Sequence, residues 1–320
     1  MAEDHRSLLD LHRLVIDKSP KSDQNPQFRL LGRAACPVRA LEWDETASQA
    51  RGSMRITGNT VIVTGASMGI GAATAVEFAR YGADVLLVAR NVARLEVVAR
   101  EITERGGRAH VHPCDVSDRR AVVRLVDEVT TEHGAPHILV NNAGAGRFRF
   151  IDDTTGEEFE RMAAVPYLAA GYLTTALLPA MVDRGVGHIV NVNSPASRVV
   201  WPASAGYAAS RYGLRGLTEA LRVDLKGTGI GVTEIIPGHV VSEYFRNNPG
   251  SAVNIPAVSR LMPTLTPQHV AARIVRATAC EHDEVFLPQF LRAMAVAARF
   301  APRITRRVVA ATGTKRPATR

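Results

Sequence analysis

The chain has 320 residues, of which 46% are hydrophobic, and this suits one large folded domain or two small ones. Its three cysteines are widely spaced and form no CxxC pair, so neither a disulfide scaffold nor a metal site is expected, and a reducing compartment fits best. The net charge of +8 belongs to residues 285–320, which carry eight Arg or Lys and no Asp or Glu; the balanced remainder argues against a nucleic-acid-binding protein.

Residues 1–53 alternate charges, prolines and short apolar runs without a sustained period. They are predicted to be a disordered or weakly structured extension, with a docked arm as the alternative. The N-terminus lacks the apolar segment of a secretory signal, and we expect no run of about 18 uncharged apolar residues that would span a membrane. A cytoplasmic location is therefore expected.

From Thr60 onward, segments rich in Val and Ile alternate with segments of helical pattern. The predicted strands are residues 61–63, 84–89, 108–112, 137–140, 188–192, 231–236 and 284–287. The predicted helices are residues 71–81, 92–105, 117–133, 155–183 (intact or broken near Pro166), 204–226 and 267–280. Strands that are each followed by a helix predict a doubly wound α/β domain with a parallel sheet, a Rossmann fold, over residues 54–290.

A glycine-rich loop, TGASMGIG at Thr64–Gly71, joins the first predicted strand to the first helix. Gly65 would permit the tight turn, while Gly69 and Gly71 would let a pyrophosphate and the helix come close. Free amides and the helix dipole at this point favour an anion. The loop therefore predicts a dinucleotide-binding site.

The second predicted strand ends at Ala89, followed by Arg90. A protein that selects NAD usually has Asp or Glu near this point, to bind the ribose 2′-hydroxyl. A cation there accepts a 2′-phosphate instead, so the sequence favours NADP over NAD. The alternative is that Arg90 only covers the strand end at the surface.

Several motifs in order resemble the short-chain dehydrogenase/reductase family over residues 54–290. They are the TGxxxGIG loop, Asn141–Gly144 (NNAG) after the fourth strand, Cys114–Val116, and the turn Pro237–Ser242. The resemblance implies an oxidoreductase with a nicotinamide dinucleotide. The cofactor-binding residues that it and the loop chemistry imply are Thr64, Gly65, Ser67, Gly69, Ile70, Gly71, Arg90, Asp115, Val116, Asn142, Ala143, Gly144, Tyr207, Arg211, Pro237, Gly238, Val240 and Ser242.

The resemblance also implies a catalytic site. Tyr207 follows Ser194 by thirteen residues, the family's spacing between the proton-donating tyrosine and the serine that polarises the carbonyl. A free tyrosine has a pKa of about 10 and needs a positive charge nearby to act near neutral pH. Arg211 occupies the position of the family's lysine, four residues after the tyrosine, and completes the predicted catalytic set.

Two positions depart from the family's pattern. Arginine is planar and bulkier than the compact ammonium of lysine, so Arg211 is not a conservative exchange. Pro166 stands where the family has an asparagine, and proline offers neither a side-chain amide nor a backbone N–H. These departures motivate the alternative of a catalytically impaired protein that binds the dinucleotide as a sensor or dimerisation partner.

The loop that follows Gly238 bears on the substrate. It contains Tyr244, Phe245, Ile255, Val258, Leu261 and Met262. An apolar lid of this kind favours a lipophilic alcohol or carbonyl compound, although these side chains can equally pack on the protein's own core. His239 lies beside the predicted nicotinamide turn and is a weaker candidate for a substrate contact.

Residues 291–320 form a predicted basic amphipathic tail, in which Arg292, Arg299, Arg303, Arg306 and Arg307 share one side of a helical wheel. Pro302 favours two short helices over one long one. The tail suits peripheral contact with an anionic membrane, so that deleting residues 289–320 would reduce liposome binding, or else a subunit contact or a solvated surface. The family resemblance further implies a homo-oligomer built on the helices at 155–183 and 204–226.

Overall fold

The computed structural model describes residues 54–316, except 249–250, 258 and 260–261. The predicted N-terminal extension, residues 1–53, lies outside the described residues, as do Val258 and Leu261 of the predicted lid.

The centre of the fold is a seven-stranded sheet in the order β3-β2-β1-β4-β5-β6-β7, and every neighbouring pair is parallel. The strands are β1 Thr60–Thr64, β2 Asp84–Ala89, β3 Arg108–Pro113, β4 Ile138–Asn141, β5 Gly187–Val192, β6 Ile230–Pro237 and β7 Glu284–Leu287. The chain order reverses between β1 and β4, where doubly wound sheets open a crevice for a ligand. The predicted Rossmann fold is confirmed.

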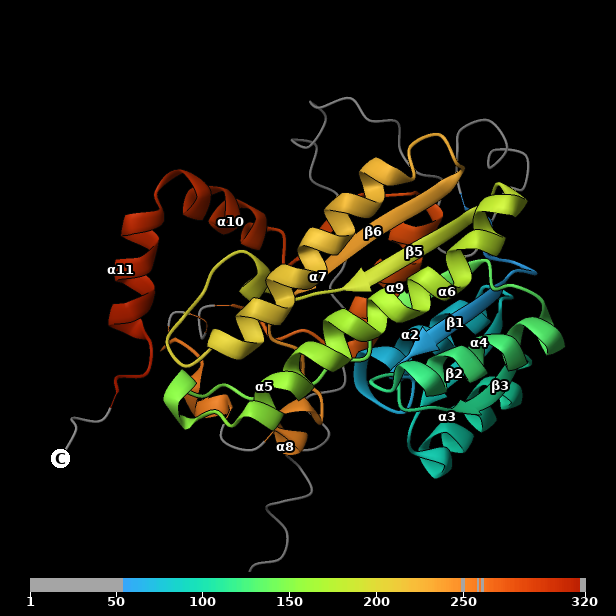
Figure 1. Ribbon diagram of the computed structural model, residues 1–320, viewed down its shortest axis with the longest axis horizontal. Helices are drawn as coiled ribbons and strands as arrows, with labels where there is room; N and C mark the ends of the chain where they lie inside the picture. Colours follow the sequence, from blue (N-terminus) through green and yellow to red (C-terminus); the bar gives the residue numbers. More distant parts are fainter. Residues whose placement is uncertain (1–53, 249–250, 258, 260–261, 317–320) are drawn as a thin grey trace, which may run out of the picture. The chain divides into compact units, whose positions relative to one another are not determined.

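Helices cover both faces of the sheet (Figure 1). They are α2 Gly69–Arg80, α3 Val92–Glu104, α4 Arg119–His133, α5 Gly156–Ala163, α6 Ala169–Arg184, α7 Ala205–Asp224, α8 Tyr244–Asn247, α9 Pro267–Ala279, α10 Phe290–Phe300 and α11 Pro302–Thr312. One core contains side chains of α2, α3 and α9, and the other contains side chains of α4, α6 and α7. Because successive strand residues point to opposite faces, Val61 and Val63 join the first core while Ile62 joins the second.

Polar side chains set where several helices begin. The Asp118 carboxylate accepts a 2.8 Å hydrogen bond from the Arg120 amide, so this residue, rather than Ser117, caps α4. Thr155 and Glu158 form a reciprocal capping box at the start of α5. The starts of α4 and α5, where these caps lie, were predicted from the sequence to within two residues.

Pro166 lies in a π-helical turn, Ala164–Leu168, that joins α5 to α6 without a break. Proline cannot donate the usual helical hydrogen bond and its ring crowds the preceding turn, so the helix widens there. The predicted segment is thus one continuous helical run with a local distortion.

The same run, Gly156–Arg184, is long and apolar enough to cross a membrane by length and composition, and residues 162–182 carry no charged side chain. The expectation that no such run exists was therefore wrong. In this fold Leu173 and Leu177 of α6 are buried in the second core, and 39% of the apolar window is buried inside the structure.

The terminal segment forms two helices, as Pro302 predicted. After α11 the chain contacts distant loops: the Thr314 hydroxyl donates a 3.0 Å hydrogen bond to the Val253 carbonyl, and Arg316 pairs with Asp152 at 2.7 Å. This segment therefore contacts the domain through the buried Leu291 and Val309 and through the residues after α11, while most of its other residues are exposed.

Candidate active site

The glycine-rich turn is built as a cradle at the start of α2. Gly65 and Gly69 have φ angles of +66° and +57°, which side-chain-bearing residues rarely adopt. A Cβ at Gly71 would lie 2.1 Å from the Gly65 carbonyl oxygen, so only glycine lets the helix approach the turn. No side chain caps the start of α2 at Met68, which leaves the first helical amides available to an anion.

Thr64 and Asn142 bind β1 to the loop after β4. The Thr64 hydroxyl accepts hydrogen bonds from the amides of Asn142 at 2.9 Å and Ala143 at 3.0 Å. The Asn142 side-chain amide donates a 2.9 Å hydrogen bond back to the Thr64 carbonyl. These bonds hold the two sides of the sheet's crevice at a fixed separation.

Charged groups gather where the adenosine end of a dinucleotide would lie. The Asp115 carboxylate accepts hydrogen bonds from the amide and hydroxyl of Ser117, and Arg90 lies 3.8 Å from it. Burial raises the pKa of Asp115, but the Ser117 hydrogen bonds and the Arg90 charge outweigh it, leaving the pKa below its usual value. A second cation, Arg94, pairs with Glu243 at 2.6 Å.

Cys114 lines the same end of the cavity as a buried thiol. Burial, followed by the neighbouring Asp115 and Asp118 charges, raises its pKa to about 11. The thiol is therefore protonated at neutral pH and presents an uncharged wall.

The predicted nicotinamide turn is fixed to two neighbouring segments. The Gly238 amide donates a 2.7 Å hydrogen bond to the Leu287 carbonyl, and Val240 forms an isolated parallel bridge with Leu265. The turn therefore follows β6 as a positioned element of the site rather than as a free loop.

Ser194, Tyr207 and Arg211 all line one cavity, and all three side chains are at least 90% buried. The Arg211 guanidinium donates a 3.1 Å hydrogen bond to the Val192 carbonyl and lies 5.0 Å from the centre of the Tyr207 ring. Its Nε is buried and has no hydrogen-bond partner among the described residues. The structure thus places a fixed positive charge beside the predicted proton donor.

A buried ionic network lies behind Ser194. The Asn193 side chain accepts a hydrogen bond from the Ser194 amide and donates one of 2.5 Å to Glu234. Glu234 is fully buried and pairs with Arg198 at 2.7 Å. Because a buried charge is costly without its partner, this network fixes the backbone that presents the serine.

Tyr244 was assigned from sequence only to the lid, but it reaches the chemical site. Its hydroxyl donates a 3.0 Å hydrogen bond to the Gly146 carbonyl. Burial, the neighbouring Tyr207 and a hydrogen bond with that tyrosine raise the pKa of Tyr244 well above its usual value. Tyr244 is thus a neutral hydroxyl group next to the predicted catalytic tyrosine.

The cavity has a volume of about 1580 Å³ and runs from the glycine-rich turn past Tyr207 to an apolar end. Its apolar wall contains Phe148, Met162, Trp201, Ile255, Met262, Leu291, Met294 and Val309, and the charged Arg147, Glu158, Arg161 and Arg198 line the cavity as well. Tyr244, Ile255 and Met262 of the predicted lid line the cavity and also pack against core clusters, and His239 lines the cavity as well. Sequence reasoning missed Phe148, Trp201 and Val309, which lie in segments without a motif.

Of the predicted site residues, all but two line this cavity. Thr64 and Gly71 are buried behind its wall, where they support the Asn142 loop and the glycine turn. Pro166 is buried outside the cavity, while its neighbours Met162 and Val165 line it.

The residues present fit a dinucleotide. The glycine cradle and the uncapped start of α2 suit the negatively charged pyrophosphate of such a cofactor. The long cavity suits its extended shape. The same cavity retains an apolar end beyond Tyr207, where a substrate can meet the cofactor.

The sequence of residues 59–250 matches the protein family described as short chain dehydrogenase. The chain belongs to the short-chain dehydrogenase family. The predicted family membership, and with it the assignment to an oxidoreductase family that uses NAD or NADP, is confirmed.

Three similar proteins show how far the likeness extends. "Probable oxidoreductase EphD" of Mycobacterium tuberculosis (strain ATCC 25618 / H37Rv) is 39% identical over 183 residues, which cover 57% of this chain and 31% of that protein. Estradiol 17-beta-dehydrogenase 11 of Pongo abelii is 32% identical over 250 residues, which cover 77% of this chain and 80% of that protein. A crystal structure of a metagenomic short-chain oxidoreductase in complex with NADP has a TM-score of 0.62 and 32% identity, covering 73% of this chain and 97% of that one. The chain thus spans about a third of the length of EphD but most of the other two.

Proposed function

We propose that this chain is an NADP-dependent oxidoreductase that interconverts a lipophilic alcohol and its ketone or aldehyde. The observation that carries the proposal is the single cavity in which the glycine turn, the Ser194–Tyr207 pair and an apolar end are continuous. The similarity to an estradiol dehydrogenase supports a lipophilic substrate.

The chemistry at the reacting oxygen would belong to Ser194 and Tyr207. NADPH, when bound, supplies the hydride that reduces a carbonyl carbon. Ser194 would donate a hydrogen bond to the carbonyl oxygen, and Tyr207 would donate the proton that completes the alcohol. This donation would leave Tyr207 as a phenolate, which the Arg211 charge would favour, and in the reverse direction the phenolate would take the proton of the alcohol.

The choice of NADP is supported by two cations that line the adenosine end, Arg90 and Arg94. The second strand ends at Ala89, so no carboxylate stands at that position for a ribose 2′-hydroxyl. Arg90 already lies near Asp115, and a 2′-phosphate would compete for the same guanidinium. NADPH should therefore bind more tightly than NADH in a fluorescence titration, and equal or reversed affinities would remove this part of the proposal.

The test of the reaction is NADPH consumption with a panel of ketones of increasing apolar size. We expect Tyr207→Phe to lower kcat by about 10²–10⁴-fold, the usual contribution of general acid catalysis, with NADPH affinity retained. Tyr212→Phe is the matched control, because Tyr212 lies on the same helix but outside this cavity and is 41% exposed.

A dinucleotide-binding protein without turnover remains the alternative, motivated by Arg211 and Pro166. NADPH binding without consumption of any ketone, and without an effect of Tyr207→Phe, would favour that alternative and contradict the proposed reaction.

A further inference from the structure

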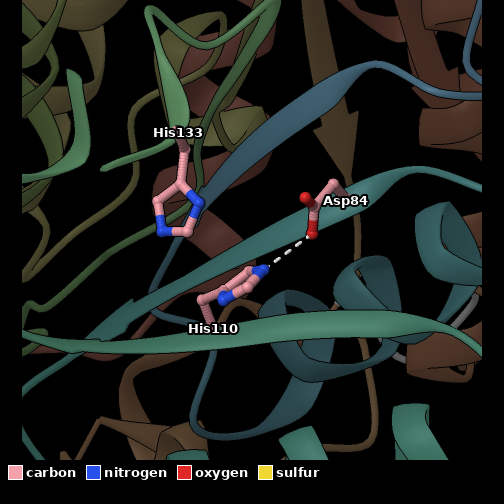
Figure 2. Close-up of side chains that lie close together, drawn as sticks. All are labelled: Asp84, His110 and His133. Atoms are coloured by element: carbon pink, nitrogen blue, oxygen red, sulfur yellow. Dashed lines mark hydrogen bonds and ion pairs between the residues drawn. The ribbon is translucent and has the colours of Figure 1, made fainter. Parts of the chain in front are cut away.

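Three histidines meet on the α4-covered face near the outer edge of the sheet. His110 and His112 are two residues apart on β3 and therefore point to the same face of the sheet, and His133 is the last residue of α4. The ring centre of His133 lies 4.3 Å from that of His110 and 5.6 Å from that of His112. Figure 2 shows the His110 and His133 side chains next to each other, with Asp84 of β2 beside them, and the two ring planes are tilted by 49°.

Carboxylates orient these rings. Asp84 Oδ1 lies 3.0 Å from His110 Nε2, and Glu128 Oε1 lies 2.8 Å from His112 Nδ1. A carboxylate that accepts one ring N–H leaves the other nitrogen as a lone-pair donor, which is how metal-binding histidines are commonly fixed.

His112 gives an independent indication that a ligand belongs here. Its side chain is 4% exposed, and its Nε2 is buried without a hydrogen-bond partner among the described residues. A buried polar atom left unpaired costs free energy, and a metal ion would satisfy it.

The possible ligand atoms are already close. One atom from each of Asp84, His110 and His133 lies within 4.8 Å of the others, and the same holds for His112, Glu132 and His133.

We propose that His110, His112 and His133 bind one divalent transition-metal ion such as Zn²⁺, with the carboxylate of Glu132 completing the site. Three nitrogens and one oxygen suit the tetrahedral coordination of zinc, in which ligand atoms lie about 3.4 Å apart, so small side-chain rotations would close the site. Arg108, which lies 3.8 Å from Asp84, is the nearby cation that the metal would displace or tolerate. The expectation of no metal rested on the cysteines, and it gave no weight to histidines brought together by folding.

The site would connect β2, β3 and α4 near the outer edge of the sheet. Its residues are distant in the sequence from Tyr207. β3 leads directly into Cys114 and Asp115 at the adenosine end of the cavity. Metal binding is therefore expected to stabilise the folded chain, since an ion that binds only the native state raises its stability.

The test is calorimetric titration of Zn²⁺ into the full chain, prepared without a histidine tag and treated with chelator. We expect one equivalent of zinc per chain and a rise in the unfolding temperature. The double variant His110→Gln/His133→Gln should lose saturable binding, while His269→Gln, at an exposed residue of α9, should keep it. NADPH affinity reports whether each variant is folded.

A milder variant guards against misfolding of the double variant. Glu128→Gln should weaken zinc binding by about 10–100-fold, the usual effect of losing a carboxylate behind a histidine ligand. Absence of one-equivalent binding to the unmodified chain, or equal zinc affinity in the folded histidine variant, would overturn the proposal.

Discussion

Arg211 is a buried cation beside Tyr207. Arg211 is 5% exposed, and its guanidinium donates a hydrogen bond to the Val192 carbonyl. A Cβ added to Gly144 would lie only 2.9 Å from Nη2 of Arg211. The ammonium group of lysine is a compact charge, and it lacks the planar set of N–H donors that the arginine guanidinium has. The surrounding loop is thus closely packed around arginine.

We expect Arg211→Lys to lower kcat/KM about 10-fold or more, since the new ammonium would lose the fixed contact at Val192 and leave space beside Gly144. Steady-state kinetics with the best substrate of the ketone panel measures the effect, and NADPH titration serves as the folding control. A rise in turnover would instead show that arginine is a compromise at this position.

His188 should make stability depend on pH. It is fully buried on β5, its Nε2 lies 2.8 Å from the Thr233 hydroxyl, and burial lowers its pKa to about 3. In the unfolded chain a histidine has a pKa of about 6.5. Between these values the unfolded chain binds the extra proton, so the His188 contribution is present above pH 6.5 and is lost as pH falls toward 3.

The free energy of unfolding should therefore fall by about 2 kcal/mol between pH 7 and pH 5 through this group alone. Urea unfolding at both pH values measures the change, and His188→Gln should reduce it while the exposed-site variant His269→Gln should not. An identical pH dependence in all three proteins would contradict the assignment.

At the scale of elements, α10 and α11 have two different faces. Leu291, Met294 and Val309 line the apolar end of the cavity. On the outside, Phe300 and Ile304 are 81% and 64% exposed, and the five tail arginines are exposed as well. The predicted basic tail is thus also a wall of the site, and the predicted domain end at residue 290 falls at the first residue of α10.

This double role changes how membrane contact should be tested. Deleting residues 289–320 would remove cavity wall, so point variants on the outer face are cleaner. We expect Phe300→Ser/Ile304→Ser to reduce sedimentation with anionic vesicles, because apolar burial and attraction of the arginines would both favour binding. Val97→Ser on α3, at a residue 59% exposed, is the control. Unchanged sedimentation of the double variant would rule out this contact.

At the scale of the whole molecule, the predicted homo-oligomer has a candidate surface on α5 and α7. Phe159, Tyr212 and Val223 on these adjacent helices are 43%, 41% and 76% exposed, so they offer apolar surface to a partner subunit. We expect a native mass of two or four chains by light scattering, and Val223→Arg should reduce it. Val97→Arg is the control, and a monomeric unmodified chain would contradict the prediction.

The sequence alone predicted the sheet, the helices and the cofactor side of the site. The reason is that their signals are local: the left-handed turn at Gly65 and Gly69 needs glycine, and strand–helix alternation follows from residues adjacent in the chain. The thirteen-residue spacing of Ser194 and Tyr207 likewise placed both in one cavity.

Only the tertiary structure decided the rest. Phe148 and Val309 come from segments more than 150 residues apart, and no local pattern marks them as walls of one cavity. His112 and His133 become neighbours because β3 and α4 pack together, and the hydroxyl of Tyr244 reaches Tyr207 because the loop after β6 folds back over the sheet. Local sequence thus determined the backbone that binds a dinucleotide, whereas long-range packing determined the substrate cavity and the histidine cluster, because both are made by side chains that meet only when distant segments bury their apolar surfaces together.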